Sequence, residues 1–272
     1  MPKPPDERAS DVSERKVKSA VRTVELLEYL ASRQERPARI REICAALDMP
    51  RSSAHALLRT LMTQGWIRAD ASGTLYGIGI RALLVGTSYL DTDPYLPVIA
   101  PFLDDLRGEL DETFHLARLD GTDVVYLATR ESRQYVRSAN RVGRRLPAYA
   151  TALGKALLAD RFGTERDEHL PAILTPLTAH TITDRAALDE VLDEVRIRGY
   201  AADNEENTVG LRCFAVALHY VQPAQDAISA SVPVARLTEE RERELVEALR
   251  AVGDKVSRVV RSMQLKHQSM PS

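Results

Sequence analysis

Hydrophobic residues recur every three or four positions through the first part of the chain, the spacing of amphipathic helices. Three such blocks predict helices at residues 16–32, 40–47 and 51–64. A tight turn at 48–50 separates the last two, with Pro50 at the helix start and Gly65 ending the third helix. Two short helices joined by such a turn are typical of a helix-turn-helix.

The pattern then changes to two short strands. Residues 66–69 and 74–78 read as strands on either side of a turn at 70–73. A hairpin directly after a helix-turn-helix is the wing of a winged-helix domain. We therefore expect a winged helix-turn-helix over residues 16–80, preceded by a disordered tail at 1–15.

Beyond the wing, helical and strand patterns are mixed, which predicts an α+β domain. A helix over 82–90 continues from the wing and connects the domains, and a hairpin is expected at 114–128 around Asp120-Gly121. The last helix, 238–265, carries apolar residues at alternating spacings of four and three, so it is either a coiled-coil seam or a helix packed on a sheet. The remaining expected elements are helices to about residue 110, at 151–160 and at 185–198, and strands near 199–203, 212–220 and 226–234.

These patterns place the domain boundaries. We expect a linker helix at 81–92, a second domain at 93–265 and a disordered tail at 266–272.

The polar face of the third predicted helix is a candidate for DNA contact. Ser52, His55 and Arg59 lie opposite its leucines, and serine hydroxyls suit phosphates while arginine suits guanine or phosphate. A solvated helix face is the simpler alternative for isolated polar residues, but the flanking helix-turn-helix and wing favour DNA. The predicted DNA-binding residues are Arg51, Ser52, Ser53, His55, Arg59, Arg68 and Ser72.

The charge distribution along the chain agrees with a DNA-binding domain at the N-terminal end. The 272 residues carry 37 Lys and Arg against 39 Asp and Glu, a net charge of −2. Residues 1–85 contribute +4 and the remainder −6, so a basic head is joined to an acidic body. The near-neutral sum argues against a protein that coats nucleic acid along its whole surface.

Composition excludes several other classes. No apolar stretch reaches membrane-spanning length, and residues 1–15 lack the apolar core of a secretory signal. The two cysteines, Cys44 and Cys213, lie far apart, so neither a zinc site nor a disulfide framework is expected. Aromatic residues make up 5% of the chain, which disfavours an RNA-stacking platform. We expect a cytoplasmic protein with reduced thiols and without a metal or cofactor.

Residues 17–86 resemble the DNA-binding domain of the IclR family of bacterial transcriptional regulators. The resemblance rests on the segments 17–22 (VKSAVR), 50–55 (PRSSAH), 57–61 (LLRTL) and 76–79 (YGIG). The family commonly has an arginine directly after the recognition-helix histidine, where this chain has Ala56.

The second half resembles the same family independently. It contains the segments 143–159 (GRRLPAYATALGKALLA), 199–206 (GYAADNEE) and 210–213 (GLRC). The resemblance implies a GAF-like effector-binding domain, a curved antiparallel sheet flanked by helices. It also implies homodimers that pair into homotetramers, and a pseudo-palindromic double-stranded operator.

The resemblance further implies a pocket for a small organic acid. Thr151 is a plausible N-cap whose helix presents the Ala152 and Leu153 amides, and helix N-termini favour anions. Ser229 and Ser231 share one strand face. The turn before them is one residue shorter than in the family and lacks its usual glycine. The tyrosine at 149 favours an aromatic or hydroxy acid. The implied effector-binding residues are Tyr149, Ala152, Leu153, Asp203, Cys213, Ser229 and Ser231.

Simpler interpretations of these residues remain open. Cys213 could be a core residue, Asp203 a turn residue, and Tyr149 only packing. A hydrolase of small acids that uses cysteine or serine is the rival class, although Cys213 and His219 lie about 20 Å apart along one strand. His115 could approach Cys213 across the sheet. A DNA-binding architectural protein without a ligand is a third option, which the acidic body disfavours.

Overall fold

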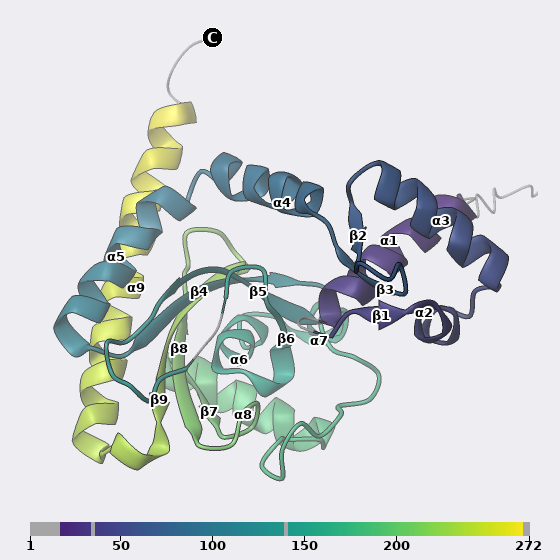
Figure 1. Ribbon diagram of the computed structural model, residues 1–272. Coiled ribbons are helices and arrows are strands. Elements are labelled where there is room, and N and C mark those ends of the chain that lie inside the picture. Colours follow the sequence, from purple (N-terminus) through teal and green to yellow (C-terminus); the bar gives the residue numbers. More distant parts are fainter. Residues whose placement is uncertain (1–16, 34–35, 139–140, 269–272) are drawn as a thin grey trace, which may run out of the picture. The chain divides into compact units, whose positions relative to one another are not determined.

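The computed structural model describes residues 17–33, 36–138 and 141–268, and the predicted tail at 1–15 lies outside these ranges. Two compact units divide the chain, Met1–Asp91 and Thr92–Ser272 (Figure 1). We call them the winged-helix unit and the sheet unit.

The winged-helix unit forms because its helices bury one apolar face each against a small sheet. Leu26, Ile43 and Leu58, from three different helices, are fully buried together. The sheet has the order β1-β3-β2 and carries Ile67 and Tyr76 into the same core. The elements are α1 (Lys18–Ser32), β1 (Ala38–Arg39), α2 (Ile40–Ala46), α3 (Arg51–Thr63), β2 (Ile67–Ala69), β3 (Leu75–Ile78) and α4 (Ile80–Thr92).

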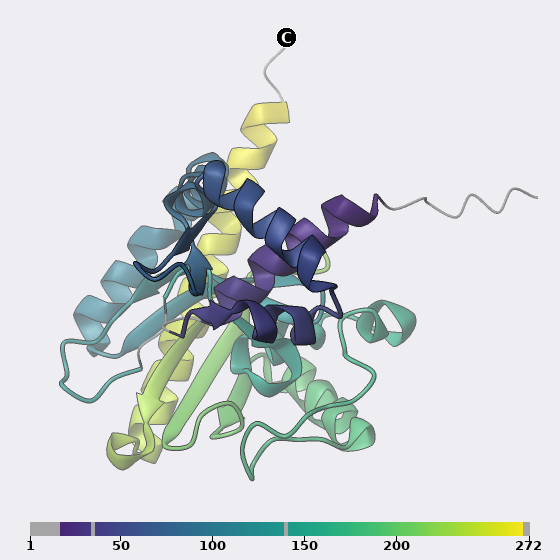
Figure 2. The same ribbon diagram turned by 45° about the vertical axis from the view of Figure 1, so that its right-hand side comes forward.

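The sheet unit is built on a six-stranded antiparallel sheet in the order β6-β5-β4-β9-β8-β7. Helices α5 and α9 cover one face, and α6 packs on the other with α8 behind it (Figures 1 and 2). The central strand β9 is buried at every position because both faces are covered. The strands are β4 (Thr113–Asp120), β5 (Asp123–Arg130), β6 (Arg145–Pro147), β7 (Ala201–Asn204), β8 (Leu211–Ala217) and β9 (Asp226–Pro233), and the helices are α5 (Leu96–Leu110), α6 (Ala152–Leu158), α7 (Gly163–Asp167), α8 (Arg185–Arg198) and α9 (Glu239–Gln268).

The expected α+β fold is confirmed, and the final helix packs on the sheet. Three short elements, β1, β6 and α7, are absent from the sequence expectations because two to five residues carry too little periodicity. The final helix also continues to Gln268, so residues 266–268 are helical and were wrongly assigned to the tail. No glycine or proline interrupts the helix there, and the rest of that tail, 269–272, lies outside the described residues.

Candidate functional sites

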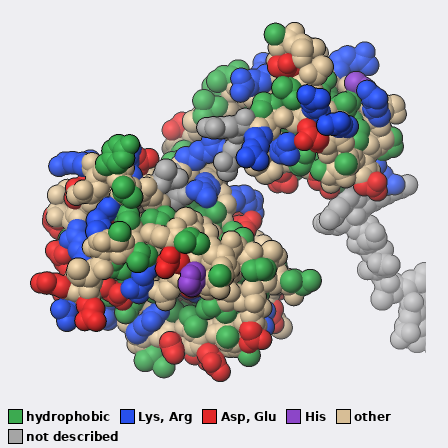
Figure 3. All heavy atoms as spheres, turned by 60° about the horizontal axis from the view of Figure 1, so that its bottom comes forward, with side chains coloured by type: hydrophobic (Ala, Val, Ile, Leu, Met, Phe, Trp, Pro, Cys, Tyr) green, Lys and Arg blue, Asp and Glu red, His purple; other side chains and the backbone are tan. Residues whose placement is uncertain are grey.

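Helix α3 presents a polar face of the kind that the sequence predicted. Ala54, Leu58 and Leu61 are buried in the unit's core. The opposite side is open to solvent and carries Arg51, Ser52, His55 and Arg59, while Ser53 is half-buried. Arg68 is exposed on β2. Lys and Arg side chains are prominent on the face of this unit that Figure 3 exposes.

Ser72 has a structural partner that the sequence did not reveal. Asp70 organises the wing turn, since its carboxylate accepts the N–H groups of Thr74 and Leu75, both at 2.8 Å. The Ser72 hydroxyl lies 2.5 Å from the same carboxylate and 2.7 Å from Thr74 Oγ1. These bonds hold the pKa of Asp70 down at about 2, with the Ser72 hydroxyl as the largest cause. The hydroxyl is thus engaged in closing the turn.

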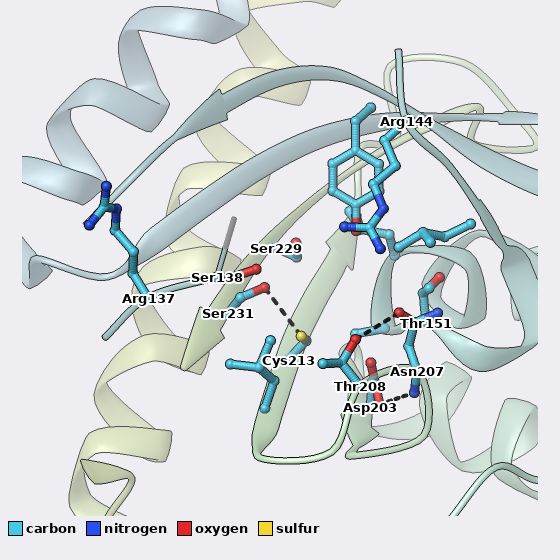
Figure 4. A pocket seen from close by; sticks show the side chains of 15 residues that line it. Arg137, Ser138, Arg144, Thr151, Asp203, Asn207, Thr208, Cys213, Ser229 and Ser231 are labelled. Carbon is cyan, nitrogen blue, oxygen red and sulfur yellow. Dashed lines mark hydrogen bonds between the residues drawn. The ribbon is translucent and has the colours of Figure 1, made fainter. Parts of the chain in front are cut away.

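The sheet unit contains a cavity of about 280 Å³ between the concave face of the sheet and helix α6 (Figure 4). It brings together side chains from β5, β6, α6, β7, β8, β9 and the loops beside them. Six of the seven residues predicted for the effector site line it, namely Ala152, Leu153, Asp203, Cys213, Ser229 and Ser231.

Helix α6 is held against the cavity by two close contacts. Thr151 caps the helix, its Oγ1 accepting the Gly154 N–H at 3.0 Å. Gly154 lies so close to the preceding turn that a Cβ there would stand 2.1 Å from the Ala148 carbonyl oxygen. Only glycine permits this approach, which lets the first turn of α6 border the cavity.

A buried charge cluster lies behind the cavity wall. Lys155, on the inner face of α6, is 1% exposed and its Nζ lies 2.5 Å from Glu206 Oε1. Asp203, at the end of β7, accepts the Glu206 N–H at 2.7 Å. Burial raises the pKa of Asp203 to about 6, and the nearby Lys155 cation opposes that rise. The sequence did not indicate the ion pair, because a lysine in a helix usually faces solvent.

Cys213 is placed for hydrogen bonding and not for nucleophilic attack. Its Sγ lies 3.2 Å from Ser231 Oγ, and burial raises the pKa of the thiol, so the thiolate is disfavoured. His115 lies on the same sheet face, but its Nδ1 is 3.1 Å from Thr129 Oγ1. Burial and the Arg144 charge lower the pKa of His115 to about 3. This arrangement disfavours the cysteine hydrolase.

Tyr149 is the one predicted effector residue that does not line the cavity. Its side chain is buried in the core beneath α6, and its hydroxyl donates to the Thr175 carbonyl oxygen at 2.7 Å. The tyrosine that borders the cavity is Tyr126, on β5. Tyr149 therefore does not border this cavity, because residues 148–150 form a buried 3-10 turn whose tyrosine packs into the core.

Other lining residues escaped the sequence reasoning altogether. Arg144 and Leu146 lie beside Tyr126, and Arg137, Ser138, Asn207, Thr208 and Leu211 complete the lining. The alternation of β5, which sends Tyr126 to the same face as Val124, was the one signal that could have found the tyrosine.

Among the described residues, no three His, Cys, Asp or Glu side chains group closely enough to hold a metal ion. Within the same part of the chain, no helix has both the length and the apolar character needed to span a bilayer.

A winged helix-turn-helix joined to an α+β unit with a polar cavity defines a class of two-domain transcriptional regulators. Two family models match the chain, one described as "IclR helix-turn-helix domain" at residues 19–71 and one as "Bacterial transcriptional regulator IclR C-terminal" at residues 87–258. The chain belongs to the IclR family of bacterial transcriptional regulators, whose members bind DNA.

Individual relatives agree with this assignment. The HTH-type transcriptional regulator KdgR of Escherichia coli strain K12 is 32% identical over 249 residues, which cover 89% of this chain and 92% of that protein. The transcriptional repressor IclR of the same strain is 32% identical over 83% of each chain.

Solved structures show the same fold. Thermotoga maritima IclR matches with a TM-score of 0.66 and 27% identity, covering 90% of this chain and all of that one. An IclR homolog from Microbacterium hydrocarbonoxydans, complexed with 4-hydroxybenzoate, has a TM-score of 0.72 at 24% identity and covers 90% of this chain and 99% of that one.

Proposed function

We propose that this protein is a ligand-responsive transcriptional regulator that binds a pseudo-palindromic operator and is switched by a small organic acid. The observation that carries the proposal is the cavity of about 280 Å³ with a polar lining, in a chain whose other unit exposes the polar face of α3. A cavity near the lower end of the ~300–1,000 Å³ range of ligand pockets suits a small effector.

The lining favours an acid over a neutral or cationic ligand. Two arginines, Arg137 and Arg144, line the cavity against a single carboxylate, that of Asp203, among the described residues. The first turn of α6 adds the backbone amides of Ala152 and Leu153, which have no acceptor within their own helix. Ser229 and Ser231 supply hydroxyls from β9.

DNA recognition in this proposal uses Arg51, Ser52, Ser53, His55 and Arg59 on α3 in the major groove. Arg68 contributes from the wing, where Ser72 holds the turn in shape. Ala56 occupies an exposed position one residue after His55, so the arginine that the family commonly has there must be replaced by other contacts.

An exposed apolar face on α4 supports a homodimer, the assembly that a pseudo-palindromic operator would match. None of the residues of α4 is buried, and five of its large apolar side chains are 51–68% exposed. A second copy of this helix would cover such a face and place two α3 helices on adjacent half-sites. The exposed apolar residues of α4 are Ile80, Leu83, Leu84, Val85 and Tyr89. Pairing of two such dimers would give the homotetramer.

The experiment begins with selection of duplexes from a random DNA pool by the full-length protein. A pseudo-palindromic consensus is expected, and small carboxylic acids are then screened by thermal shift, because a ligand stabilises the state that it binds. An acid that raises the melting temperature should change operator affinity by roughly 5- to 150-fold.

A double variant separates sensing from DNA binding. Ser229→Ala with Ser231→Ala should blunt the response to the acid and leave operator binding intact. Loss of operator binding in the double variant would instead assign the serines a structural role. If the wild-type protein binds its selected operator equally well with and without every acid, and no acid binds in the thermal-shift screen, the ligand-responsive function is refuted.

A further inference from the structure

The effector cavity is chemically different at its two ends. Arg144 enters from the β6 side with its guanidinium directed into the cavity, whereas Asp203 lies at the other end, beside Asn207 and Thr208 (Figure 4). The Asp203 side chain is 3% exposed and is the one carboxylate of the lining in the described part of the chain. A ligand that spans the cavity therefore meets a cation at one end and a hydrogen-bond acceptor at the other.

The two lining arginines have different roles. Arg137 is exposed and lies at the margin of the cavity (Figure 4). Arg144 is half-buried, and its charge reaches the cavity wall, where it helps to lower the pKa of the buried His115. The cation that faces the interior is therefore Arg144.

We propose that Arg144 binds the carboxylate of the effector at one end of the cavity. Together with Asp203 at the other end, it makes the cavity selective for small monocarboxylic acids that carry a hydroxyl group at the end away from the carboxylate. This inference rests on the proposed acid-sensing function and names its ligand class and a specificity-determining residue. A guanidinium offers two parallel N–H donors that match a carboxylate. At the other end, the ligand hydroxyl donates to Asp203.

The arrangement also rejects a class of ligand. A second carboxylate at the far end would lie against Asp203, and like charges repel when both are ionised. The charged and titratable groups that face Asp203 are Lys155 on α6, Glu206 after β7, Cys213 on β8 and Tyr126 on β5. Because the pKa of Asp203 is about 6, the rejection of dicarboxylates should be full near pH 8 and should weaken as the pH falls below about 6.

The test uses isothermal titration of the full-length protein with three probes of one shape: 4-hydroxybenzoate, 4-hydroxybenzamide and terephthalate. Arg144→Gln should weaken 4-hydroxybenzoate about ten- to a hundredfold, the loss expected for a charge-assisted hydrogen bond, and should leave the amide nearly unchanged. Arg144→Lys keeps the charge but not the paired donors, so its affinity for 4-hydroxybenzoate should lie between those of the wild type and Arg144→Gln.

Arg145→Gln is the matched control. Arg145 is the next residue, carries the same charge and is exposed, and it pairs with Asp120 at 3.0 Å and Asp123 at 3.2 Å outside the cavity. Its loss should change neither the acid nor the amide affinity. Terephthalate should bind more weakly than 4-hydroxybenzoate near pH 8, and Asp203→Asn should remove that difference.

The outcomes distinguish the roles of Arg144 and Asp203 from acid sensing itself. Equal losses for acid and amide in Arg144→Gln, or no loss, would overturn the role of Arg144, and a preference for terephthalate near pH 8 would overturn that of Asp203. Failure of the wild-type protein to bind 4-hydroxybenzoate and its aliphatic counterpart 4-hydroxybutanoate, when the screen yields another acid, would overturn the hydroxy-acid class. Failure to bind any acid of the screen would overturn acid sensing itself. That result involves no variant, so it is distinguishable from failure of the Arg144 assignment.

Discussion

The two units of this protein place the polar residues of their proposed sites in opposite environments. On α3 of the winged-helix unit, residues such as His55 and Arg59 are exposed and contribute nothing to the apolar core. In the sheet unit, Asp203, Ser229 and Ser231 are buried around a cavity, where Asp203 and Ser231 are hydrogen-bonded to their neighbours. Substitutions of the exposed polar residues of α3 should therefore change DNA binding without changing stability, whereas substitutions of polar residues at the cavity should change stability or the response to the acid.

The largest effect expected from this contrast is on Lys155. Lys155→Met leaves Glu206 buried without its partner, next to Asp203, and should lower the free energy of unfolding by about 3–5 kcal/mol. Urea unfolding near neutral pH measures the loss. Lys155→Met with Glu206→Gln should recover much of it, because the unpaired charge is then removed as well. Unchanged stability of the single variant would show that the cavity wall tolerates an unpaired charge. Polar substitutions in the two units would then differ less in their effect on stability than the burial of the residues indicates.

Gly154→Ala should have the next largest effect. The added Cβ would stand 2.1 Å from the Ala148 carbonyl oxygen, so the turn that positions α6 must shift, at a cost of about 3 kcal/mol. Thermal unfolding checks the loss. Gly108→Ala is the matched control, since Gly108 lies within α5 and a Cβ added there would meet no neighbouring group within 4 Å, so alanine should stabilise the helix by about 0.5–1 kcal/mol. Equal effects of the two substitutions would contradict the close-packing argument.

Asp203→Asn should stabilise the protein in a pH-dependent way. The pKa of Asp203 is raised from 3.8 to about 6 in the folded state, chiefly by burial. The folded protein therefore holds this proton more tightly than the unfolded chain. The resulting stability is present below about pH 4 and is lost as the pH rises through about 6.

The asparagine variant does not titrate, so it should be more stable than the wild type by about 2 kcal/mol near pH 8 and similar to it near pH 4. Urea unfolding at both pH values gives the two differences. A gain in stability that is the same at both pH values would show that folding does not raise the pKa of Asp203.

The contrast between the units also explains what could be predicted from the sequence. Helical spacing predicted α1, α2 and α3, and the exposed positions of α3 follow directly from that spacing, since the proposed DNA-binding face is local to one helix. The cavity is assembled from β5, β6, α6, β7, β8 and β9, so the residues there depend on strand order and register. The family resemblance indicated six of the residues that line it.

What those motifs could not indicate was the direction of individual side chains. Tyr149 was assigned to the cavity and Tyr126 was not, because a 3-10 turn gives no periodicity from which to read which way a ring points. Lysines in helices usually face solvent, and no motif indicated that Lys155 lies against Glu206.

Arg59→Ala is expected to have the smallest effect on stability and a specific effect on operator affinity. Arg59 is exposed, so the free energy of unfolding should change by no more than about 0.5 kcal/mol. Operator affinity should fall. If Arg59 contacts a phosphate, the slope of log affinity against log salt concentration should become shallower by about 0.9.

Titration of the selected operator over a salt series measures this slope. Arg258→Ala is the control, since it removes the same charge from an exposed position on α9 of the sheet unit and should leave the slope unchanged. An equal change of slope in both variants would mean that DNA responds to the total charge of the protein, and the division into an exposed DNA-binding face and a buried sensing site would lose its support. A loss of affinity without a change of slope would place Arg59 on a base edge, where it would discriminate between sequences and not add to phosphate attraction.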